Sequence, residues 1–231
     1  MLQESGQTEL LATVAHEMRN PLAAIQAAVR VLDKKDQTIA RREQVRDLID
    51  RQVLRIARLS DDLLSAGYMA TGKLELRKER IDLRDVVNHA AEACRPQLEA
   101  GNFLVLLLLP PEPVTLEADP IRMTQVLTNL LDNSAKYSAH YGMIVVSVED
   151  RRSEVTIRVV DHGIGIPTEL LPRIFDLFVQ ADHPPSRSVH GMGIGLSVVR
   201  RIVELHQGTV EAFSAGPELG STFTIHLPRN A

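Results

Sequence analysis

The first 70 residues carry apolar side chains at the spacing of two long amphipathic helices. One apolar seam recurs at alternating intervals of four and three residues: Leu11, Ala15, Met18, Leu22, Ile25, Val29 and Leu32. After a polar stretch that begins at Asp33, a second seam has the same spacing: Val45, Ile49, Gln52, Ile56, Leu59 and Leu63. We therefore predict an antiparallel helical hairpin over residues 1–70.

A single hairpin of two amphipathic helices has little core of its own, so its apolar seams need a further partner. Two hairpins that pair into a four-helix bundle would bury both seams, and we therefore expect a homodimer. The alternative is a hairpin that packs against the second half of its own chain.

From Ile81 the pattern changes to a mixture of helices and strands. Asp82 and Asp119 are N-cap candidates, and Pro120 suits a first helical position, so a helix is predicted after each aspartate. A further helix is predicted at 194–204. Apolar runs predict strands at 103–109, 144–148 and 155–160, and residues 209–213 and 222–227 read as two more strands. The sequence therefore predicts an α+β fold in which an α/β sandwich, with helices on one face of a sheet, follows the hairpin.

The boundary between the two halves is a charged stretch. Residues 71–80 read as a linker or a short strand, which leaves residues 81–231 for the second domain. Within that domain, the run 103–109 is apolar without interruption, a pattern that favours a strand buried on both faces.

Composition narrows the class of protein. The chain has 231 residues, of which 44% are hydrophobic and 24% charged, so a wholly disordered chain is excluded. Its net charge of −4 gives no basic footprint for nucleic acid. Cys94 is the one cysteine, which we expect to be a small buried side chain. No apolar run approaches the roughly 18 residues of a membrane span, and no signal peptide is evident, so we expect a cytoplasmic location.

An aspartate and two glycines follow one of the predicted strands directly. In Asp161-His-Gly-Ile-Gly-Ile-Pro167, the carboxylate could accept a hydrogen bond from an exocyclic amine of a purine, and Gly163 and Gly165 would let the backbone approach the ring. An ordinary Asp-Gly turn would have the same letters.

A second glycine motif leads into a predicted helix. Gly191-Met-Gly-Ile-Gly-Leu-Ser197 would expose backbone N–H groups to a phosphate chain at the helix N-terminus. It is neither the GxGxxG of dinucleotide-binding folds nor a GxxxxGK[ST] phosphate loop. The polar stretch 179–190 before it resembles a lid over a ligand, and an ordinary surface loop is the alternative.

Two asparagines lie on one face of the helix that follows Asp119. Asn129 and Asn133 are four residues apart, and Lys136 follows three residues later. Amide oxygens can ligate Mg²⁺, and a lysine can meet a phosphate as a point charge. A solvated helix face that ends in asparagine would give the same pattern.

Together these motifs resemble those of the histidine kinases, in the same order along the chain. Residues 129–137 are similar to the N box of that family, 161–167 to its G1 box, 174–178 to its F box, 191–196 to its G2 box and 220–223 to its closing Gly-Ser/Thr motif. Each match is weak alone, but five independent matches in the family's order are together strong evidence for the resemblance.

The hairpin carries a further match. His16-Glu-Met-Arg-Asn-Pro21 resembles the H box of the family's dimerisation and phosphotransfer domain, and His16 falls just outside the apolar seam. A neutral imidazole is a competent nucleophile near pH 7, and the adjacent carboxylate of Glu17 could orient the ring and take its proton. Pro21 has no N–H group and leaves the carbonyl of Glu17 without its helical partner.

The resemblance implies a role for each matching residue. On the hairpin, His16 would be the phospho-acceptor, Glu17 the base, and Asn20 the residue that positions water when the bundle dephosphorylates its partner. On the helix after Asp119, Asn133 would hold Mg²⁺ with Asn129 nearby. The remaining residues would contact the nucleotide: Lys136 and Tyr137 at the phosphates or ribose, Asp161, Gly163 and Gly165 at the adenine, Gly191, Gly193 and Gly195 at the lid hinge and phosphates, and Ser221 near the adenine through water.

The resemblance thus implies the catalytic core of a sensor histidine kinase. Such a core uses Mg-ATP to phosphorylate His16, passes the phosphoryl group to an aspartate of a response regulator, and meets a membrane only through a sensor region outside this chain. One alternative is a serine kinase or a chaperone- or repair-type ATPase on the same fold, against which the His16 motif argues. The other is a degenerate module that dimerises and docks a regulator without turnover, against which the intact Asn133, Asp161 and glycine motifs argue.

Overall fold

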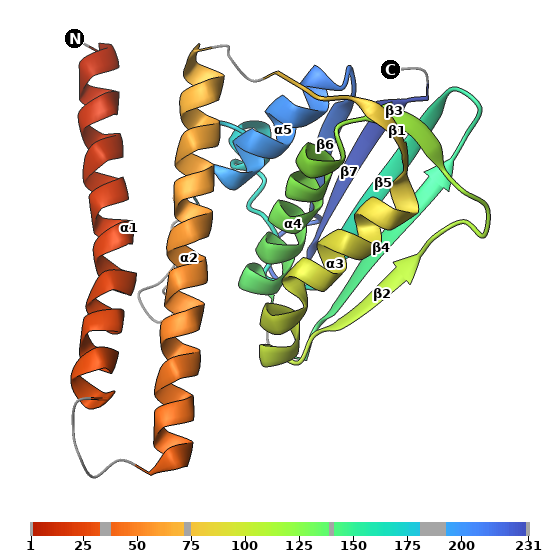
Figure 1. Cartoon of the computed structure of the whole chain (residues 1–231). Helices are drawn as coiled ribbons and strands as arrows, with labels where there is room; N and C mark the ends of the chain where they lie inside the picture. Colours follow the sequence, from red (N-terminus) through yellow and green to blue (C-terminus); the bar gives the residue numbers. More distant parts are fainter. Residues whose placement is uncertain (1, 33–37, 72–74, 139–140, 181–192, 230–231) are drawn as a thin grey trace. The chain divides into compact units, whose positions relative to one another are not determined.

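A computed structural model describes residues 2–32, 38–71, 75–138, 141–180 and 193–229 (Figure 1). Within the hairpin the side chains of a number of these residues, His16 and Glu17 among them, are outside the description. The chain divides into two compact units, of which the first ends at Gly72 and the second begins at Lys73. The boundaries that the sequence predicts at 70 and 80 stay a prediction.

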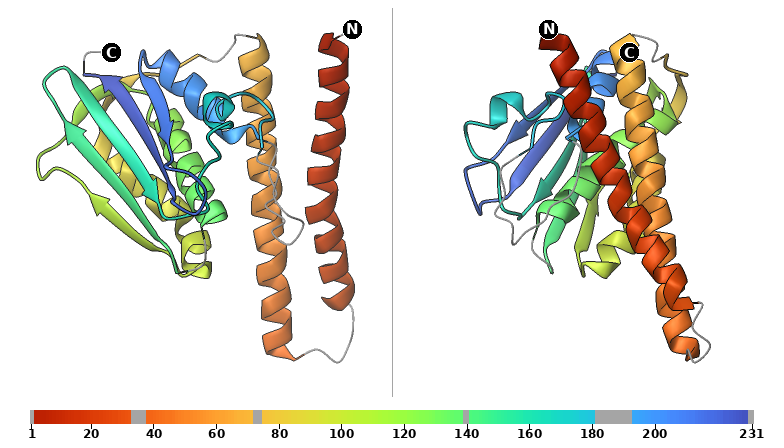
Figure 2. Two further views of the ribbon diagram at one scale, coloured as in Figure 1. Left: turned by 180° about the vertical axis from the view of Figure 1, so that it is seen from behind. Right: turned by 90° about the vertical axis from the view of Figure 1, so that its left-hand side faces the viewer.

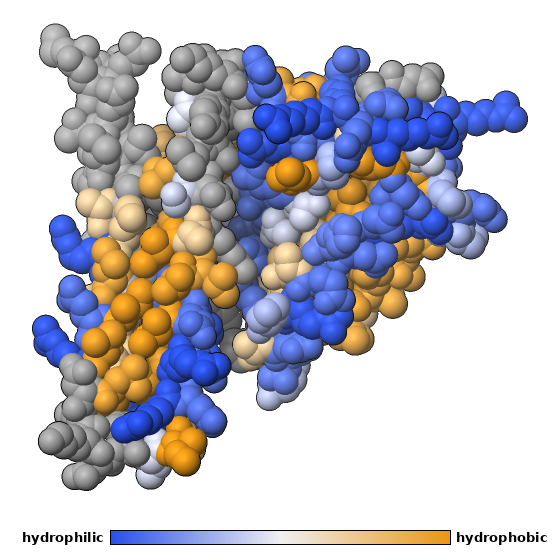
Figure 3. All heavy atoms as spheres, viewed as in Figure 1, coloured by the Kyte–Doolittle hydropathy of each residue, from blue (hydrophilic) through white to orange (hydrophobic). Residues whose placement is uncertain are grey.

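The first unit is a hairpin of two long helices, α1 (Leu2–Leu32) and α2 (Ile39–Thr71), as predicted. Ala28, Val45 and Leu59 are buried, whereas Leu22, Val29, Val53 and Leu54 remain about half exposed. Apolar side chains gather over both helices on the face of the hairpin that Figure 3 presents. The two helices therefore pack together without burying all of their apolar surface.

The second unit is a sandwich of helices on a mixed sheet. The sheet has the strand order β2-β4-β5-β7-β6, in which β2 and β4 are parallel and the other neighbours antiparallel. Helices α3, α4 and α5 cover one face of it (Figures 1 and 2). Two further strands, β1 and β3, form a separate antiparallel pair. The bounds of these elements are β1 Glu79–Asp82, α3 Leu83–Ala100, β2 Leu104–Leu108, β3 Thr115–Ala118, α4 Pro120–Tyr137, β4 Met143–Asp150, β5 Glu154–Asp161, the short 3-10 helix η1 Leu171–Arg173, α5 Gly195–Leu205, β6 Thr209–Phe213 and β7 Ser221–Pro228.

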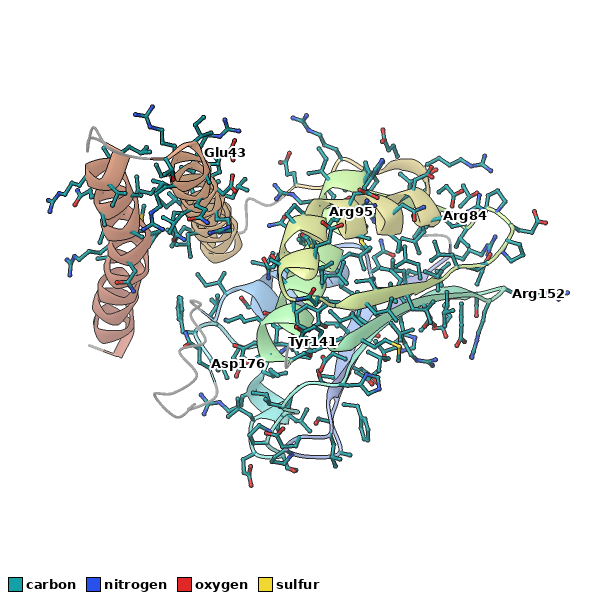
Figure 4. All side chains as sticks on the ribbon, turned by 90° about the horizontal axis from the view of Figure 1, so that it is seen from below. Glu43, Arg84, Arg95, Tyr141, Arg152 and Asp176 are labelled. Carbon is teal, nitrogen blue, oxygen red and sulfur yellow. The ribbon has the colours of Figure 1, made fainter. Side chains whose placement is uncertain are left out.

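Local sequence explains where α3 and α4 begin. The carboxylate of Asp82 accepts a hydrogen bond from the backbone N–H of Arg84 at 3.1 Å, and the carboxylate of Asp119 accepts one from the N–H of Arg122 at 3.1 Å. Both aspartates therefore cap helices as predicted. The guanidinium of Arg84, labelled in Figure 4, also binds Asp82 and holds the pKa of that carboxyl below its usual value.

The core lies between the helices and the sheet, where side chains from both layers meet (Figure 4). Its fully buried members include Leu83 of α3, Leu127 of α4, Ile202 of α5 and Ile157 of β5. Cys94 of α3 is also buried, and its Sγ lies 3.9 Å from the carbonyl oxygen of Thr128. This layer fixes the spacing between α4, α5 and the end of β5, where the predicted site residues lie.

One prediction about the sheet is wrong. We expected residues 103–109 to form a strand buried on both faces, but β2 is an edge strand, and Leu104, Leu106 and Leu108 are 66%, 43% and 50% exposed. The helices cover only the other face of the sheet, so every second side chain of β2 points away from the core.

Candidate functional site

The carboxylate of Asp161 is the most tightly held group of the predicted site. Asp161 ends β5 and is only 5% exposed. Its Oδ1 accepts hydrogen bonds from the N–H groups of Gly163 at 2.8 Å and Ser221 at 3.3 Å, and its Oδ2 accepts from the hydroxyls of Ser221 at 2.5 Å and Ser134 at 3.5 Å. The bonds at 3.3 and 3.5 Å are long, so each oxygen keeps capacity for a further donor.

The loop after Asp161 is joined to the end of α4. The backbone N–H of Ile164 donates to the carbonyl oxygen of Tyr137 at 2.9 Å. A Cβ atom on Gly163 would lie 2.4 Å from that same oxygen and 2.9 Å from Oδ1 of Asp161. Gly165 has φ +69°, and a Cβ there would lie 2.0 Å from the carbonyl oxygen of Gly216. Both glycines are therefore required by close approach of the backbone, and an ordinary Asp-Gly turn does not explain them.

This close packing predicts the effect of Gly163→Ala. The added methyl group has no room without a shift of Tyr137 or Asp161, so we expect a loss of about 1–3 kcal/mol in the free energy of unfolding of the second unit. Thermal unfolding measured by calorimetry tests this. Gly67→Ala in α2 is the matched control, because nothing lies within 4 Å of its Cβ, and it should leave stability equal or slightly raised. Equal melting temperatures for Gly163→Ala and the wild type would contradict the prediction.

The predicted asparagine and lysine side chains lie on α4, and all are partly buried. Nδ2 of Asn129 donates to the carbonyl oxygen of Gly195 at 3.2 Å, which connects α4 to the first residue of α5 and leaves Oδ1 of the amide as an acceptor. The ammonium of Lys136 lies 3.2 Å from the hydroxyl of Tyr137 and 4.8 Å from the centre of its ring. Burial raises the pKa of the Tyr137 hydroxyl, so it stays protonated at neutral pH.

The second glycine motif is described in part. Gly191 and most of the predicted lid, from residue 181, lie outside the described residues. Gly193 has φ +66°, and its carbonyl oxygen accepts a hydrogen bond from the N–H of Phe178 at 2.9 Å. Ile194 has no side-chain acceptor to cap α5, which begins at Gly195. The side chain of Ile194 therefore accepts no hydrogen bond from the first N–H groups of α5. A helix N-terminus that binds phosphate uses such N–H groups as donors.

The predicted phospho-acceptor motif lies on α1. His16 and Glu17 belong to this helix, but their side chains are outside the described residues, so the predicted roles of both stay predictions. Asn20 is partly buried and lies one turn further along the same helix. Pro21 is buried, and α1 continues through it.

Two serines that the sequence analysis passed over support the site. Ser134, on α4, donates to Asp161 and joins this helix to β5. Ser214 accepts a hydrogen bond from the N–H of Ile166 at 3.0 Å and donates to the carbonyl oxygen of Gly220 at 2.7 Å. The place of Ser134 directly after Asn133 was an available signal, whereas nothing near Ser214 in the sequence points to its partners.

Helices on one face of a mixed sheet, a strand-end aspartate held by serines, and the glycine segments that follow it define an ATP-binding domain of a widespread class. Residues 118–231 match the family described as "Histidine kinase-, DNA gyrase B-, and HSP90-like ATPase". Residues 6–71 match the "His Kinase A (phospho-acceptor) domain". The chain therefore belongs to the sensor histidine kinase family and carries its catalytic core.

Individual relatives agree with this assignment. The sensor protein kinase WalK of Staphylococcus aureus is 31% identical over 97% of this chain, which spans about half (54%) of that relative. The structure of full-length ShkA in complex with AMPPNP matches with a TM-score of 0.68 and 26% identity over 96% of this chain and 46% of that one. A chain in the crystal structure of histidine kinase ThkA in complex with response regulator protein TrrA has the same fold, with a TM-score of 0.66 and 24% identity over 99% of this chain and 63% of that one.

These matches confirm the predicted fold class, a helical hairpin followed by a mixed α/β domain for ATP. Among the described residues, no helix combines the length and the apolar character needed to cross a bilayer.

Proposed function

We propose that this chain is an ATP-dependent protein histidine autokinase that phosphorylates His16 and passes the phosphoryl group to an aspartate of a response regulator. The observation that carries the proposal is that one chain combines two features. The carboxylate of Asp161 is held in place by hydrogen bonds, and a helical hairpin carries an H-box motif.

We assign the adenine-binding role to Asp161. Its Oδ atoms would accept a hydrogen bond from the exocyclic amine, and the hydroxyl of Ser221, 2.5 Å from Oδ2, would help to hold the carboxylate in place. Gly163 and Gly165 would form the wall against the ring, because they let the loop after Asp161 pack closely against Tyr137 and Gly216 and so fix its backbone beside the carboxylate. Gly191, Gly193 and Gly195 are assigned to the lid hinge and the phosphates.

The donor set on α4 fits a magnesium nucleotide. Asn133 and Asn129 offer amide oxygens, which Mg²⁺ accepts alongside water and phosphate oxygens, and Lys136 offers a positive charge to a phosphate. When bound, the ion would neutralise charge on the phosphates during transfer. Asn129 is held by its bond to Gly195, so Asn133 is assigned as the ligand and Asn129 as its neighbour. Tyr137 is assigned to the ribose or phosphates.

The proposed reaction is an in-line displacement. A neutral nitrogen of His16 attacks the γ-phosphorus of ATP, a nitrogen–phosphorus bond forms, and the bond from that phosphorus to the bridging oxygen of ADP breaks. Glu17 takes the proton that the imidazole loses. In the second step an aspartate carboxylate of the regulator attacks the phosphorus, an oxygen–phosphorus bond forms and the nitrogen–phosphorus bond breaks, and the leaving nitrogen takes up a proton to restore the neutral imidazole. Asn20 positions water for later dephosphorylation of the regulator.

The fold of the kinase–regulator complex formed by ThkA and TrrA supports a response regulator as the protein partner. Because ATP and response regulators are cytoplasmic, we place this catalytic core in the cytoplasm, with any membrane contact made through a sensor region outside it.

We also propose that the hairpin forms a homodimer. Leu22 and Val29 of α1 and Val53 and Leu54 of α2 are about half exposed, and a four-helix bundle of two hairpins would bury them. A dimer has two copies of each contact, and each leucine is already about half buried, so burying the rest of one such leucine contributes about 1.5–3 kcal/mol per dimer.

The dimer proposal predicts that Leu22→Glu converts the dimer to a monomer. Burial of two carboxylates and loss of two leucine contacts should raise the dissociation constant at least about 100-fold. Sedimentation velocity over a range of concentrations measures this. Ala27→Glu is the matched control, because Ala27 is exposed and lies about 140° around α1 from Leu22. A wild-type chain that sediments as a monomer would contradict the proposal.

The autokinase proposal is tested by incubating the wild-type chain with Mg²⁺ and ATP labelled in the γ-phosphate. Label that is stable in alkali and lost in acid is the expected result, because phosphohistidine has this chemistry and phosphoserine does not. Bound ATP without label would instead identify a degenerate docking module, and acid-stable label would identify a serine kinase on the same fold.

A further inference from the structure

Helices α4 and α5, which carry the proposed metal ligands and part of the proposed phosphate contacts, pack against each other and are joined at both ends of α5. At one end, Nδ2 of Asn129 binds the carbonyl oxygen of Gly195 at the start of α5. At the other end, His206 follows the last residue of α5 and lies against Asp119, which precedes α4. The second tie has no part in the proposed chemistry and is formed by buried polar groups.

The imidazole of His206 is only 1% exposed, and both of its nitrogens have backbone partners. Nε2 lies 2.9 Å from the backbone nitrogen of Asp119, and Nδ1 lies 2.8 Å from the carbonyl oxygen of Ile202. Since Asp119 supplies an N–H donor, Nε2 must accept, and since Ile202 supplies an acceptor, Nδ1 must carry the proton. These partners select the neutral ring in a single tautomer.

Asp119 extends this tie to a third segment. Its carboxylate, in a residue that is 5% exposed, accepts a hydrogen bond from the N–H of Arg122 at the start of α4 and another, at 2.9 Å, from the N–H of Arg77. Arg77 lies in the stretch between the hairpin and β1. A continuous set of hydrogen bonds therefore runs from the end of α5 through His206 and Asp119 to the segment that follows the hairpin.

We propose that His206 is a positioning residue of the nucleotide site, which holds α4 at a fixed spacing from α5 and anchors the segment at Arg77 through Asp119. The proposal rests on the proposed autokinase function and adds a residue that does not touch the nucleotide. Asn129 and Asn133 lie further along α4 than the contact with His206, which is at the start of that helix. The N-terminus of α5, which would face the phosphates, lies at the opposite end of α5 from His206. A shift of α4 along α5 would therefore change the distance between the groups of α4 that would hold the metal and phosphates and the phosphate-binding N-terminus of α5.

The tie should weaken in acid. Burial lowers the pKa of His206, and so does the positive charge of Lys78, whereas its bond to the carbonyl of Ile202 and the negative charge of Asp119 act in the opposite direction. Because the pKa is lower in the folded chain than in the unfolded one, this contribution to stability is present in full above about pH 6.5 and is lost as the pH falls below it. A proton on Nε2 would face the N–H of Asp119 and break that bond.

Two substitutions of His206 distinguish a role of its hydrogen bond to Asp119 from a role in filling space in the core. In His206→Gln the side-chain amide reaches the position of Nε2, so it can still accept from Asp119 and cannot titrate. In His206→Asn the shorter amide reaches only the position of Nδ1, so the bond to Asp119 is lost. We expect His206→Asn to raise the dissociation constant for ATP at least about tenfold at pH 7.5, with the rate of autophosphorylation at saturating ATP within about threefold of wild type. His206→Gln should bind ATP within about twofold of wild type.

Two readouts do not depend on catalysis. Amide hydrogen exchange at Arg77 and Asp119 should accelerate at least about tenfold in His206→Asn and remain slow in His206→Gln. Between pH 7.5 and 5.5 the affinity of the wild type for ATP should fall further than that of His206→Gln, since the titration of ATP itself is common to both.

The proposal is overturned if His206→Asn lowers only the melting temperature and binds ATP as the wild type does. It is also overturned if His206→Gln and the wild type lose affinity equally in acid, and this comparison decides the matter should His206→Asn fail to fold. A wild-type chain that binds no ATP would refute the proposed function instead, and the exchange of Arg77 and Asp119 would then show whether the tie exists.

Discussion

The substitution His16→Gln should abolish incorporation of label from γ-labelled ATP, with a loss of at least about 1,000-fold relative to the wild type. Glutamine is similar in length to histidine and polar, but its amide nitrogen is not nucleophilic, so no covalent phosphoenzyme can form. The measurement is acid-labile, alkali-stable label per chain after a fixed incubation with Mg²⁺ and labelled ATP.

The control for this experiment is ATP binding by the same variant. His16 lies on α1 in the hairpin unit, and the proposed nucleotide contacts come from α4, α5 and β5 in the second unit, so His16→Gln should bind ATP with wild-type affinity. Label that persists in the variant would mean that the acceptor is another residue. His89 on α3, His162 directly after β5 and His226 on β7 would then be the first alternatives to test, because all three are at least partly exposed.

Replacing Asp161 by asparagine should weaken ATP binding strongly while the second unit stays folded. The variant replaces one carboxylate oxygen by an NH₂ group, which would face donors from Gly163 or Ser221 at a site that is 5% exposed. It also loses the charge that strengthens a hydrogen bond to the adenine amine. A hydrogen bond to a charged group contributes about 1.5–3 kcal/mol, so we expect the dissociation constant to rise about 10- to 100-fold or more.

Isothermal titration of the Asp161→Asn variant with a non-hydrolysable ATP analogue measures this loss. Glu211→Gln is the matched control, because it removes one carboxylate charge at an exposed position of β6. Circular dichroism of both variants establishes that they are folded. Wild-type affinity in Asp161→Asn would place the adenine elsewhere, and an equal loss in both variants would point to net charge and not to a specific contact.

Features that depend on neighbouring residues could be predicted from the sequence. The N-caps Asp82 and Asp119, and the proline at the start of α4, are local signals, and both helices begin where the sequence places them. The hairpin could be predicted because its helices repeat one spacing for many turns. The glycines after Asp161 could be singled out because they are close together in the sequence and directly follow a predicted strand, although their close partners, Tyr137 and Gly216, could not be predicted.

Features that depend on distant partners could not be predicted in this way. The apolar run of β2 does not disclose that its strand lies at the edge of the sheet, because strand order is set by the whole domain. Ser214 and His206 bind backbone atoms that are many residues away, in the case of His206 at Asp119. The sequence around His206 does not show whether this buried histidine positions two helices or only fills space in the core.

The exposed leucines of β2 bear on how this chain behaves at high concentration. Leu104 and Leu108 bound a strand without a single charged residue, and its outer edge has no neighbouring strand in the described sheet. Proteins commonly protect such edges from pairing with another molecule by lysines, bulges or prolines. Here that protection comes from the brevity of the strand and from Pro110 and Pro111, which follow it and cannot donate to an added strand. Replacing these two prolines would therefore lengthen the unpaired edge of β2 and favour aggregation into fibres, even though neither residue belongs to the core or the site.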